Sequence, residues 1–303
     1  MKIKIPFIRR GSKTTDPVFV DLTSDFGFKT ILANEANKDV LLELLRQLIP
    51  DEDIAKIEHI DKEKKARTKA GKSVAFDVYC KTADGKRIII EMQNKSQKFF
   101  LSRSIFYSTF AVQDQLKRGL KDYDFAPVYM ISFVCEDIPE FKGRTNIITR
   151  VNLCTREDNL FVADNLNYIY IELKKFTKTE ADLSADDVLD GLLYSIKNMA
   201  TLKAMPQKLR TPLFQRLYEA SRFAAMNALE QYKYIKMMTT KEDIKAQMHW
   251  EREQGREEGR EGERHKIVNN MSAHGLSEDE IAKSIGVSLE EVRRLLNHES
   301  ELK

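Results

Sequence analysis

The chain has 303 residues, of which 42% are hydrophobic and 32% are charged, and its formal net charge is only +3. This length suits one substantial core with an appendage, or two modest domains. Because the charges nearly balance, any basic surface for nucleic acid has to be local. No apolar run approaches the roughly 20 residues that cross a bilayer, and residues 1–10 lack the apolar stretch of a secretory signal. We therefore expect a cytoplasmic protein with no membrane contact.

The first elements are predicted from helix caps and apolar spacing. Thr23 and Ser24 supply caps for a helix that opens near Asp25, and a second helical run covers residues 40–48. Residues 54–60 alternate apolar and polar side chains, which is typical of a strand. We therefore predict a helical start that leads into a sheet.

A β-hairpin is predicted next. Residues 74–80 alternate with period two and are rich in β-forming side chains, and residues 87–93 form a second apolar run. Between them, Asp84-Gly85 supplies the positive φ that a tight turn requires. The two runs are therefore expected to pair as antiparallel neighbours.

The middle of the chain adds a helix and further strands. Residues 99–121 have helical periodicity. Residues 128–135 form a near-continuous apolar run, which suits a central strand buried on both faces. Residues 147–153 and 168–173 supply one or two further strands. The order helix, three strands, helix, strand predicts an α/β core with helices packed over a mixed sheet.

From residue 184 onward the chain is predicted to be helical. Amphipathic helices cover residues 186–204 and 212–238, and residues 241–265 are almost all charged. Alternating charge of this kind is typical of a solvated single helix. The alternative is a homo-oligomer, because glycines on one stripe would let a second helix approach closely. These glycines are Gly255, Gly259 and Gly262.

The last segment, residues 277–297, follows the helix-turn-helix pattern. Ser277 and Glu280 make a capping box before a short helix that Gly286 ends, and a second short helix follows. Glutamates at the start of that second helix repel phosphate, and two arginines after them offset this repulsion. The segment is therefore interpreted either as a DNA contact or as a helical packing or dimerisation module.

These patterns divide the chain into four expected parts. A basic lead-in covers residues 1–20, and the α/β core covers residues 21–180. A helical region covers residues 181–240, and the charged helix with its helix-turn-helix-like end covers residues 241–303.

Cysteine and histidine spacing indicates no disulfide framework and no zinc site. The odd number of cysteines and the lack of a CxxC motif favour three buried, reduced thiols. The histidines never adopt a spacing such as HExxH. The cysteines are Cys80, Cys135 and Cys154.

A pair of acidic side chains is placed to bind a metal ion. Residues two apart on a strand face the same way, so Glu91 and Gln93 project together, and the hairpin brings Asp77 alongside them. Mg²⁺ takes oxygen ligands of this kind together with waters and substrate phosphate, and it can activate a water molecule. The alternative is that each carboxylate pairs with a nearby lysine on the solvent face.

Several motifs resemble those of one nuclease family. They are Asp25-Phe26-Gly27-Phe28-Lys29, Phe76-Asp77-Val78, Ile90-Glu91-Met92-Gln93, and a helix that contains Arg103, Tyr107 and Gln115. In this order they resemble the family of recombination-promoting nucleases and transposases, which belongs to the PD-(D/E)xK superfamily. The resemblance covers roughly residues 21–173. It implies a restriction-endonuclease-like αβββαβ core, here followed by an all-helical C-terminal region.

The resemblance also implies a set of site residues. These are Asp77, Glu91, Gln93, Asp25 and Lys29. Asp77 and Glu91 would hold Mg²⁺ or Mn²⁺, and Gln93 stands where the superfamily has lysine. Glutamine carries no charge, so it orients water by hydrogen bonds and cannot act as a base. The missing positive charge is expected from Lys29 or from Lys95.

The function that the resemblance implies is a metal-dependent DNA endonuclease linked to recombination or transposon-like DNA processing. DNA is then the expected partner. Two alternatives stay open. One is a catalytically weak DNA-binding or scaffolding protein, and the other is a nuclease that acts on RNA or invading phage nucleic acid. A metal site contacts only phosphate, so these residues do not separate the two kinds of nucleic acid.

Overall fold

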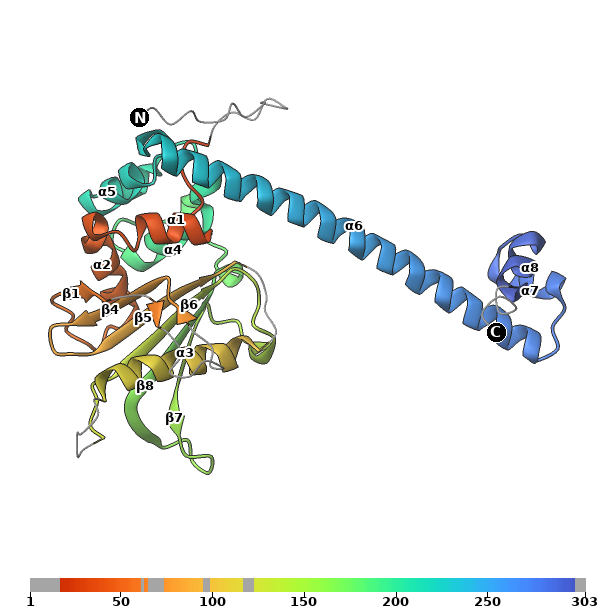
Figure 1. Ribbon diagram of the computed structural model, residues 1–303, viewed down its shortest axis with the longest axis horizontal. Helices are drawn as coiled ribbons and strands as arrows, with labels where there is room; N and C mark the ends of the chain where they lie inside the picture. The colour runs from red at the N-terminus through yellow and green to blue at the C-terminus, as the bar shows by residue number, and fades with distance from the viewer. Residues whose placement is uncertain (1–16, 61–62, 65–73, 95–98, 117–122, 298–303) are drawn as a thin grey trace. The chain divides into compact units, whose positions relative to one another are not determined.

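The computed structural model describes residues 17–60, 63–64, 74–94, 99–116 and 123–297 (Figure 1). Its contacts divide the chain into two compact units, Met1–Tyr234 and Ile235–Lys303. The four-part division expected above stays a prediction, and most of its lead-in lies outside the described residues. None of the helices in the described part of the chain combines the length and the apolar character that a membrane span requires.

A mixed six-stranded sheet forms the centre of the first unit. Its order is β1-β4-β5-β6-β8-β7, with β5, β6 and β8 parallel to one another and the other pairs antiparallel. The bounds are β1 Ile57–His59, β4 Val78–Thr82, β5 Arg87–Gln93, β6 Val128–Val134, β7 Ile148–Cys154 and β8 Phe161–Glu172. A separate pair joins β2 (Glu63–Lys64) to β3 (Val74–Ala75). The predicted α/β class is thereby confirmed.

Sequence patterns located the central strands well. All seven residues of β6 are buried, as its near-continuous apolar run predicted. The hairpin from β4 to β5 turns through Gly85, whose φ of +96° explains the need for glycine there. The carboxyl ends of the parallel strands β5, β6 and β8 therefore lie at the end of the sheet opposite this turn.

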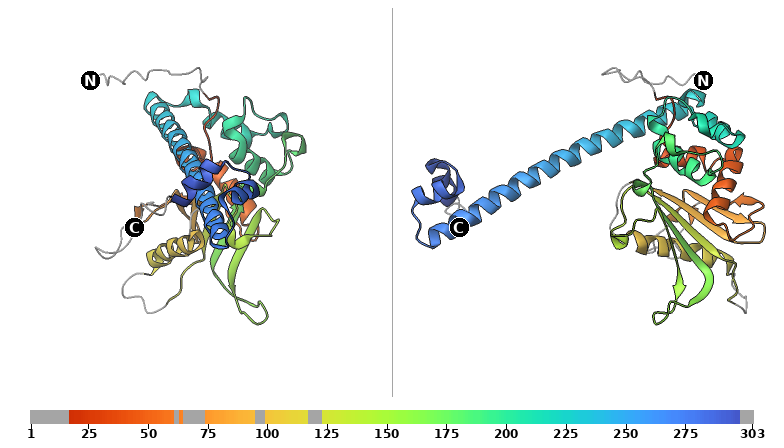
Figure 2. Two further views of the ribbon diagram at one scale, coloured as in Figure 1. Left: turned by 90° about the vertical axis from the view of Figure 1, so that its right-hand side faces the viewer. Right: turned by 180° about the vertical axis from the view of Figure 1, so that it is seen from behind.

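Helices cover both faces of this sheet (Figures 1 and 2). The helix α3, Phe100–Gln115, packs on β5 and β6. On the other face, α1 (Asp25–Ile31) places Phe28 with its ring 6.0 Å from that of Phe133 in β6. Three further helices lie on the α1 side, where α2 contacts both of the others. They are α2 Lys38–Leu48, α4 Val188–Asn198 and α5 Pro212–Ala220.

The prediction of one continuous helix over residues 212–238 is wrong: α5 ends at Ala220, a 3-10 turn covers Phe223–Ala225, and α6 (Ala228–Ala273) begins after it. There the carbonyl of Ser221 accepts the N–H of Val20 at 2.9 Å, and the N–H of Phe223 donates to Val18 at 3.1 Å. The chain then re-enters a helix at Asn227, whose side chain caps α6. A pairing with the distant N-terminal segment thus overrides local helical periodicity.

The second unit contains the C-terminal part of α6 and two short helices, α7 (Glu278–Ile285) and α8 (Leu289–Asn297). The predicted capping box of Ser277 and Glu280 is present, and Gly286 ends α7 with a φ of +69°. The three helices share a small buried core. It consists of Val268, Ile281, Ala282, Val292 and Leu295.

The expectation of three buried thiols holds fully for only one cysteine. The three residues form no disulfide, and Cys80 is fully buried. Cys135 is half-buried and Cys154 is exposed. Cys154 ends β7, the edge strand of the sheet, so one side of that residue has no neighbouring strand to cover it.

The loop before α1 fixes where that helix begins. Ser24 caps the helix by accepting the N–H of Gly27, and its own hydroxyl donates to the carbonyl of Asp21 at 2.5 Å. The N–H of Asp21 in turn donates to the hydroxyl of Tyr234 at 2.8 Å. A Cβ atom on Gly27 would lie 2.1 Å from the Asp21 carbonyl oxygen. Position 27 therefore admits only glycine at this backbone spacing.

We expect Gly27→Ala to lower the free energy of unfolding by about 1–3 kcal/mol, because the new methyl group meets a backbone oxygen that cannot rotate away. Gly259→Ala is the matched control, since nothing lies within 4 Å of a Cβ there and the site is an exposed helix interior. The control should be neutral or stabilising by up to about 1 kcal/mol. Chemical denaturation measures both, and a Gly27→Ala protein as stable as wild type would contradict this account.

Candidate active site

The residues Asp77 and Glu91 face each other across the β4–β5 hairpin. Val78 pairs with Ile90, so the same register continued by one residue places Asp77 opposite Glu91. The N–H of Asp77 donates to Glu91 Oε1 at 3.1 Å, and the N–H of Met92 donates to Asp77 Oδ2 at 2.8 Å. Both side chains are buried, with exposed fractions of 5% and 7%. Each carboxylate is therefore held in place by a backbone donor.

These two hydrogen bonds from backbone to side chain explain why the strand predicted over residues 74–80 is interrupted. Phe76 and Asp77 lie between β3 and β4 and belong to neither. Carboxylate oxygens accept hydrogen bonds from the N–H groups of Asp77 and Met92. In a regular β-ladder these N–H groups would donate to backbone carbonyls. The break is thus a consequence of placing two acidic side chains at this point in the sheet.

Burial makes the negative charge of this pair costly. It raises the pKa of Glu91 to about 8, and the charge of Asp77 adds to the effect. Burial also raises the pKa of Asp77, although the Met92 N–H and the Lys29 ammonium oppose that rise. A further positive charge beside the pair would therefore stabilise its ionised form.

A cation beside the pair comes from α1. Lys29 Nζ lies 3.0 Å from Asp77 Oδ1 and 2.7 Å from Asp25 Oδ1. Burial lowers the pKa of Lys29, but its hydrogen bonds to the two carboxylates outweigh this and raise it overall. Lys29 therefore stays protonated at neutral pH and cannot serve as a base. Asp25 is 69% exposed and meets the site only through Lys29 among the contacts described.

Gln93 follows Glu91 on the same face of β5 and is 8% exposed. Its Oε1 accepts a hydrogen bond of 2.5 Å from Arg103 Nη2 in α3. The guanidinium carbon of Arg103 lies 5.6 Å from the ring centre of Phe100 and 5.5 Å from that of Tyr107. All five candidate residues thus gather at one strand end, and Arg103 joins them.

Sequence reasoning assigned no role in the site to Arg103 or to Asn94. Asn94 Nδ2 donates to the carbonyl of Thr23 at 2.9 Å and so ties the end of β5 to the loop before α1. The spacing of positions 100, 103 and 107 on one helix face was the available signal for Arg103. The other expected source of charge, Lys95, lies outside the described residues.

Two carboxylates suit a hard divalent cation. Within the part of the chain that the structure describes, no three or more His, Cys, Asp or Glu side chains cluster as metal ligands. A closed zinc site needs about four such ligands, so it does not fit here. Mg²⁺ and Mn²⁺ accept one or two carboxylates and take waters and phosphate oxygens for the rest. Asp77 and Glu91 fit that requirement.

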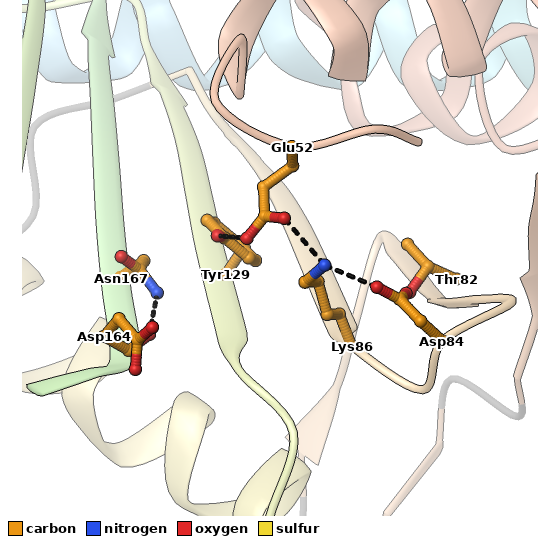
Figure 3. A network of polar contacts seen from close by, with 7 residues as sticks. All are labelled: Glu52, Thr82, Asp84, Lys86, Tyr129, Asp164 and Asn167. Atoms are coloured by element: carbon orange, nitrogen blue, oxygen red, sulfur yellow. Dashed lines mark hydrogen bonds and ion pairs between the residues drawn. The ribbon is translucent and has the colours of Figure 1, made fainter. Parts of the chain in front are cut away.

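A second polar cluster at the turn end of the same hairpin provides a contrast (Figure 3). Lys86 Nζ lies 2.7 Å from Glu52 and 2.5 Å from Asp84, and Glu52 also accepts the hydroxyl of Tyr129 at 2.5 Å. The hydrogen bond from Lys86 lowers the pKa of Asp84, whereas the pKa of Glu91 is raised. These carboxylates are stable as ordinary ion pairs, so they have little to gain from a metal ion.

Comparison with known proteins identifies a family to which the chain belongs. No curated protein and no solved structure matches the chain. The family model for PD-(D/E)XK nuclease family transposases matches residues 22–251, which include the whole sheet and every residue of the site above. With the α/β fold and its carboxylate pair on neighbouring strands, this match places the chain in the family of PD-(D/E)XK nuclease family transposases.

Proposed function

We propose that the protein is an endonuclease that hydrolyses DNA phosphodiester bonds with the aid of Mg²⁺ or Mn²⁺, in recombination or transposon-like DNA processing. Membership of its family makes the protein nuclease-like. The observation that carries the metal requirement is the burial of Asp77 and Glu91 opposite each other, with one lysine shared between Asp77 and Asp25. Such a pair is stabilised by a divalent cation.

Each residue of the site would have a different role in the reaction. Asp77 and Glu91 would hold the ion, which supplies an activated water and neutralises charge on the phosphate. Lys29 favours the ionised form of Asp77 and adds positive charge beside it. Gln93 contributes hydrogen bonds next to Glu91. Asp25 holds Lys29 from the exposed side, so we assign it a positioning role.

Asp77→Asn and Glu91→Gln should each lower cleavage of supercoiled DNA by at least about 10²-fold, because a neutral amide binds a divalent ion poorly. Both substitutions keep an oxygen that accepts the backbone N–H of Met92 or Asp77, so the fold should survive. Nicking assays with Mg²⁺, with Mn²⁺ and with EDTA measure the effect, and EDTA should abolish wild-type cleavage.

Glu52→Gln is the matched control for these variants, since Glu52 is a hydrogen-bonded carboxylate at the other end of the hairpin. It should cleave at the wild-type rate. Cleavage that persists in EDTA would contradict the metal requirement. If Asp77→Asn or Glu91→Gln cleaved at the wild-type rate, the assignment of the site would be wrong. If parallel assays showed faster cleavage of RNA than of DNA, the proposed substrate would be wrong.

The raised pKa of Glu91 predicts a pH-dependent stability. In metal-free protein the folded state keeps the Glu91 proton up to about pH 8, whereas the unfolded chain releases it near its ordinary pKa of 4.5. The unfolded state binds fewer protons between these values, so stability falls as pH rises through this window. Glu91→Gln has no carboxyl group to titrate at this position, so its stability should not fall for this reason.

We expect Glu91→Gln to gain stability over wild type by roughly 2–5 kcal/mol between pH 5 and pH 9 in EDTA. Chemical denaturation at both pH values measures the difference. Adding Mg²⁺ should stabilise wild type and leave Glu91→Gln nearly unchanged. A difference between the two proteins that is independent of pH would show that Glu91 does not titrate in this window.

We infer that the C-terminal unit adds affinity for nucleic acid or self-association. A row of exposed arginines recurs every four residues along α6 and could contact phosphates. Its members are Arg252, Arg256, Arg260 and Arg264. The glycine stripe on the same helix has nothing within 4 Å of any added Cβ, which leaves room for a second helix.

Deleting residues 241–303 should leave a protein that still cleaves, because Tyr234 and its bond to Asp21 are retained. We expect weaker DNA binding with a flatter salt dependence, or a smaller assembly. Replacing the four arginines by glutamine separates these roles, since it should weaken binding without changing the mass in solution. A truncated protein equal to full length in affinity, salt dependence and mass would rule out both roles.

A further inference from the structure

A fully buried hydroxyl without a hydrogen-bond partner lies beside the carboxylate pair. It belongs to Ser132 in β6, whose exposed fraction is 0% and whose Oγ has no partner among the residues that the structure describes. We propose that Ser132 is a positioning residue of the proposed metal site: its hydroxyl donates a hydrogen bond to the Glu91 carboxylate when that carboxylate binds a divalent cation. This inference rests on the metal requirement in the proposed function.

The register of the parallel strands places Ser132 next to Glu91. The two residues are direct partners between β5 and β6, and neighbouring strands lie about 4.8 Å apart. Both side chains face α3. Gln93, two residues after Glu91, is hydrogen-bonded to Arg103 in that helix. The neighbour of Ser132, Phe133, packs on α1 against the opposite face of the sheet. The serine and the carboxylate therefore lie side by side on one face.

The other surroundings of Ser132 are mostly apolar. Met130 and Val134, its nearest neighbours on the same face of β6, belong to a hydrophobic cluster that includes residues of α3. On its other side, Ser132 pairs with Tyr170 in β8, and the hydroxyl of that tyrosine is hydrogen-bonded to a serine of α3 at 2.7 Å. An unpaired hydroxyl in such surroundings destabilises the folded protein. Its position beside Glu91 therefore supports a role in the site more than a contribution to stability.

Glu91 can accept a further hydrogen bond. Its Oε1 accepts the N–H of Asp77 at 3.1 Å. A carboxylate has about four lone-pair sites, so it can accommodate a cation and another donor together. A serine side chain turns among staggered rotamers, so its hydroxyl can move without a shift of the backbone. Donors of this kind hold a metal-binding carboxylate in one orientation, and their loss typically weakens metal binding by about 10–100-fold.

Thr149 in β7 provides a matched control, because its buried hydroxyl also has no partner among the described residues. It lies in the same row across the sheet, since it pairs with Tyr170, the partner of Ser132 in β8. The strand order puts three strand spacings between Thr149 and Glu91, or roughly 14 Å. Thr149 therefore shares the burial of Ser132 but is too far away to contact the carboxylate.

Binding of Mn²⁺ alone to the full chain tests the proposal, with Ser132→Ala, Ser132→Thr and Thr149→Val compared with wild type. Electron paramagnetic resonance of the free ion measures the Kd in the absence of nucleic acid. We expect Ser132→Ala to raise the Kd by about 10-fold or more, because Glu91 loses its donor. Thr149→Val should keep the wild-type Kd. Ser132→Thr keeps the hydroxyl and suits a strand, so its Kd should lie within about threefold of wild type. If the added methyl group prevents folding, Ser132→Cys replaces it, and its weakly donating thiol should give an intermediate Kd.

Stability without metal separates this role from a structural one. In EDTA, Ser132→Ala and Thr149→Val should both unfold at a higher urea concentration than wild type, because each removes an unpaired buried hydroxyl. Only Ser132→Ala should combine this gain with weaker Mn²⁺ binding. In cleavage assays, Ser132→Ala should need about 10-fold more Mn²⁺ for the half-maximal rate, while kcat at saturating Mn²⁺ changes by less than about threefold.

The possible outcomes distinguish this role from the proposed function. An unchanged Kd in Ser132→Ala, or an equal rise of the Kd in Thr149→Val, would overturn the role of Ser132 and leave the proposed function intact. A lower urea midpoint for Ser132→Ala in EDTA would also overturn it, because the hydroxyl would then be bonded in the metal-free fold. Wild-type protein that binds Mn²⁺ but cleaves no nucleic acid would overturn the proposed function alone. Absence of Mn²⁺ binding by the wild type would overturn both.

Discussion

Two carboxylates buried opposite each other, Asp77 and Glu91, are the constraint on which the rest of the site depends. Moving one such charge out of water costs several kcal/mol even after the protein relaxes, and a like charge alongside adds repulsion. Two backbone N–H groups and the ammonium of Lys29 offset part of this cost. A divalent cation would offset much of the remainder. The burial of this pair therefore supports the proposed metal site more than it supports a contribution to stability.

This constraint explains why helices from both faces of the sheet have to meet one strand end. The close approach of Gly27 to the loop before α1 sets the position of Lys29, two residues further on. Hydrogen bonds from α3 to the tyrosines of β8 set the position of Arg103 in the same way. A displacement of either helix by one residue would carry its cation away from the strand end. Packing that does not touch the carboxylates thus controls their electrostatics.

The local elements of the site could be predicted from sequence because their cues are local. The period of two, together with the Asp84-Gly85 turn, is enough to place Asp77 beside Glu91 on a hairpin. The contact between Arg103 and Gln93 could not be predicted in this way, because it depends on contacts between α3 and β8 that join residues 60 and 66 positions apart along the chain. The interruption of the helix before α6 could not be predicted either, because it depends on a pairing with the distant residues Val18 and Val20. Periodicity indicates which face of an element is buried, but it does not indicate which other element that face contacts.

The structure also gives a physical reason why glutamine suits position 93 in this chain. Arg103 offers N–H donors and needs an acceptor, and the Gln93 oxygen supplies it. A lysine has three donors and no acceptor, so at this position it would leave the guanidinium without that bond and place a second cation against it. Its ammonium would then turn toward Glu91, in competition with a metal ion for the same carboxylate. Glutamine avoids both conflicts, because its amide oxygen accepts the hydrogen bond from Arg103 and its side chain carries no charge.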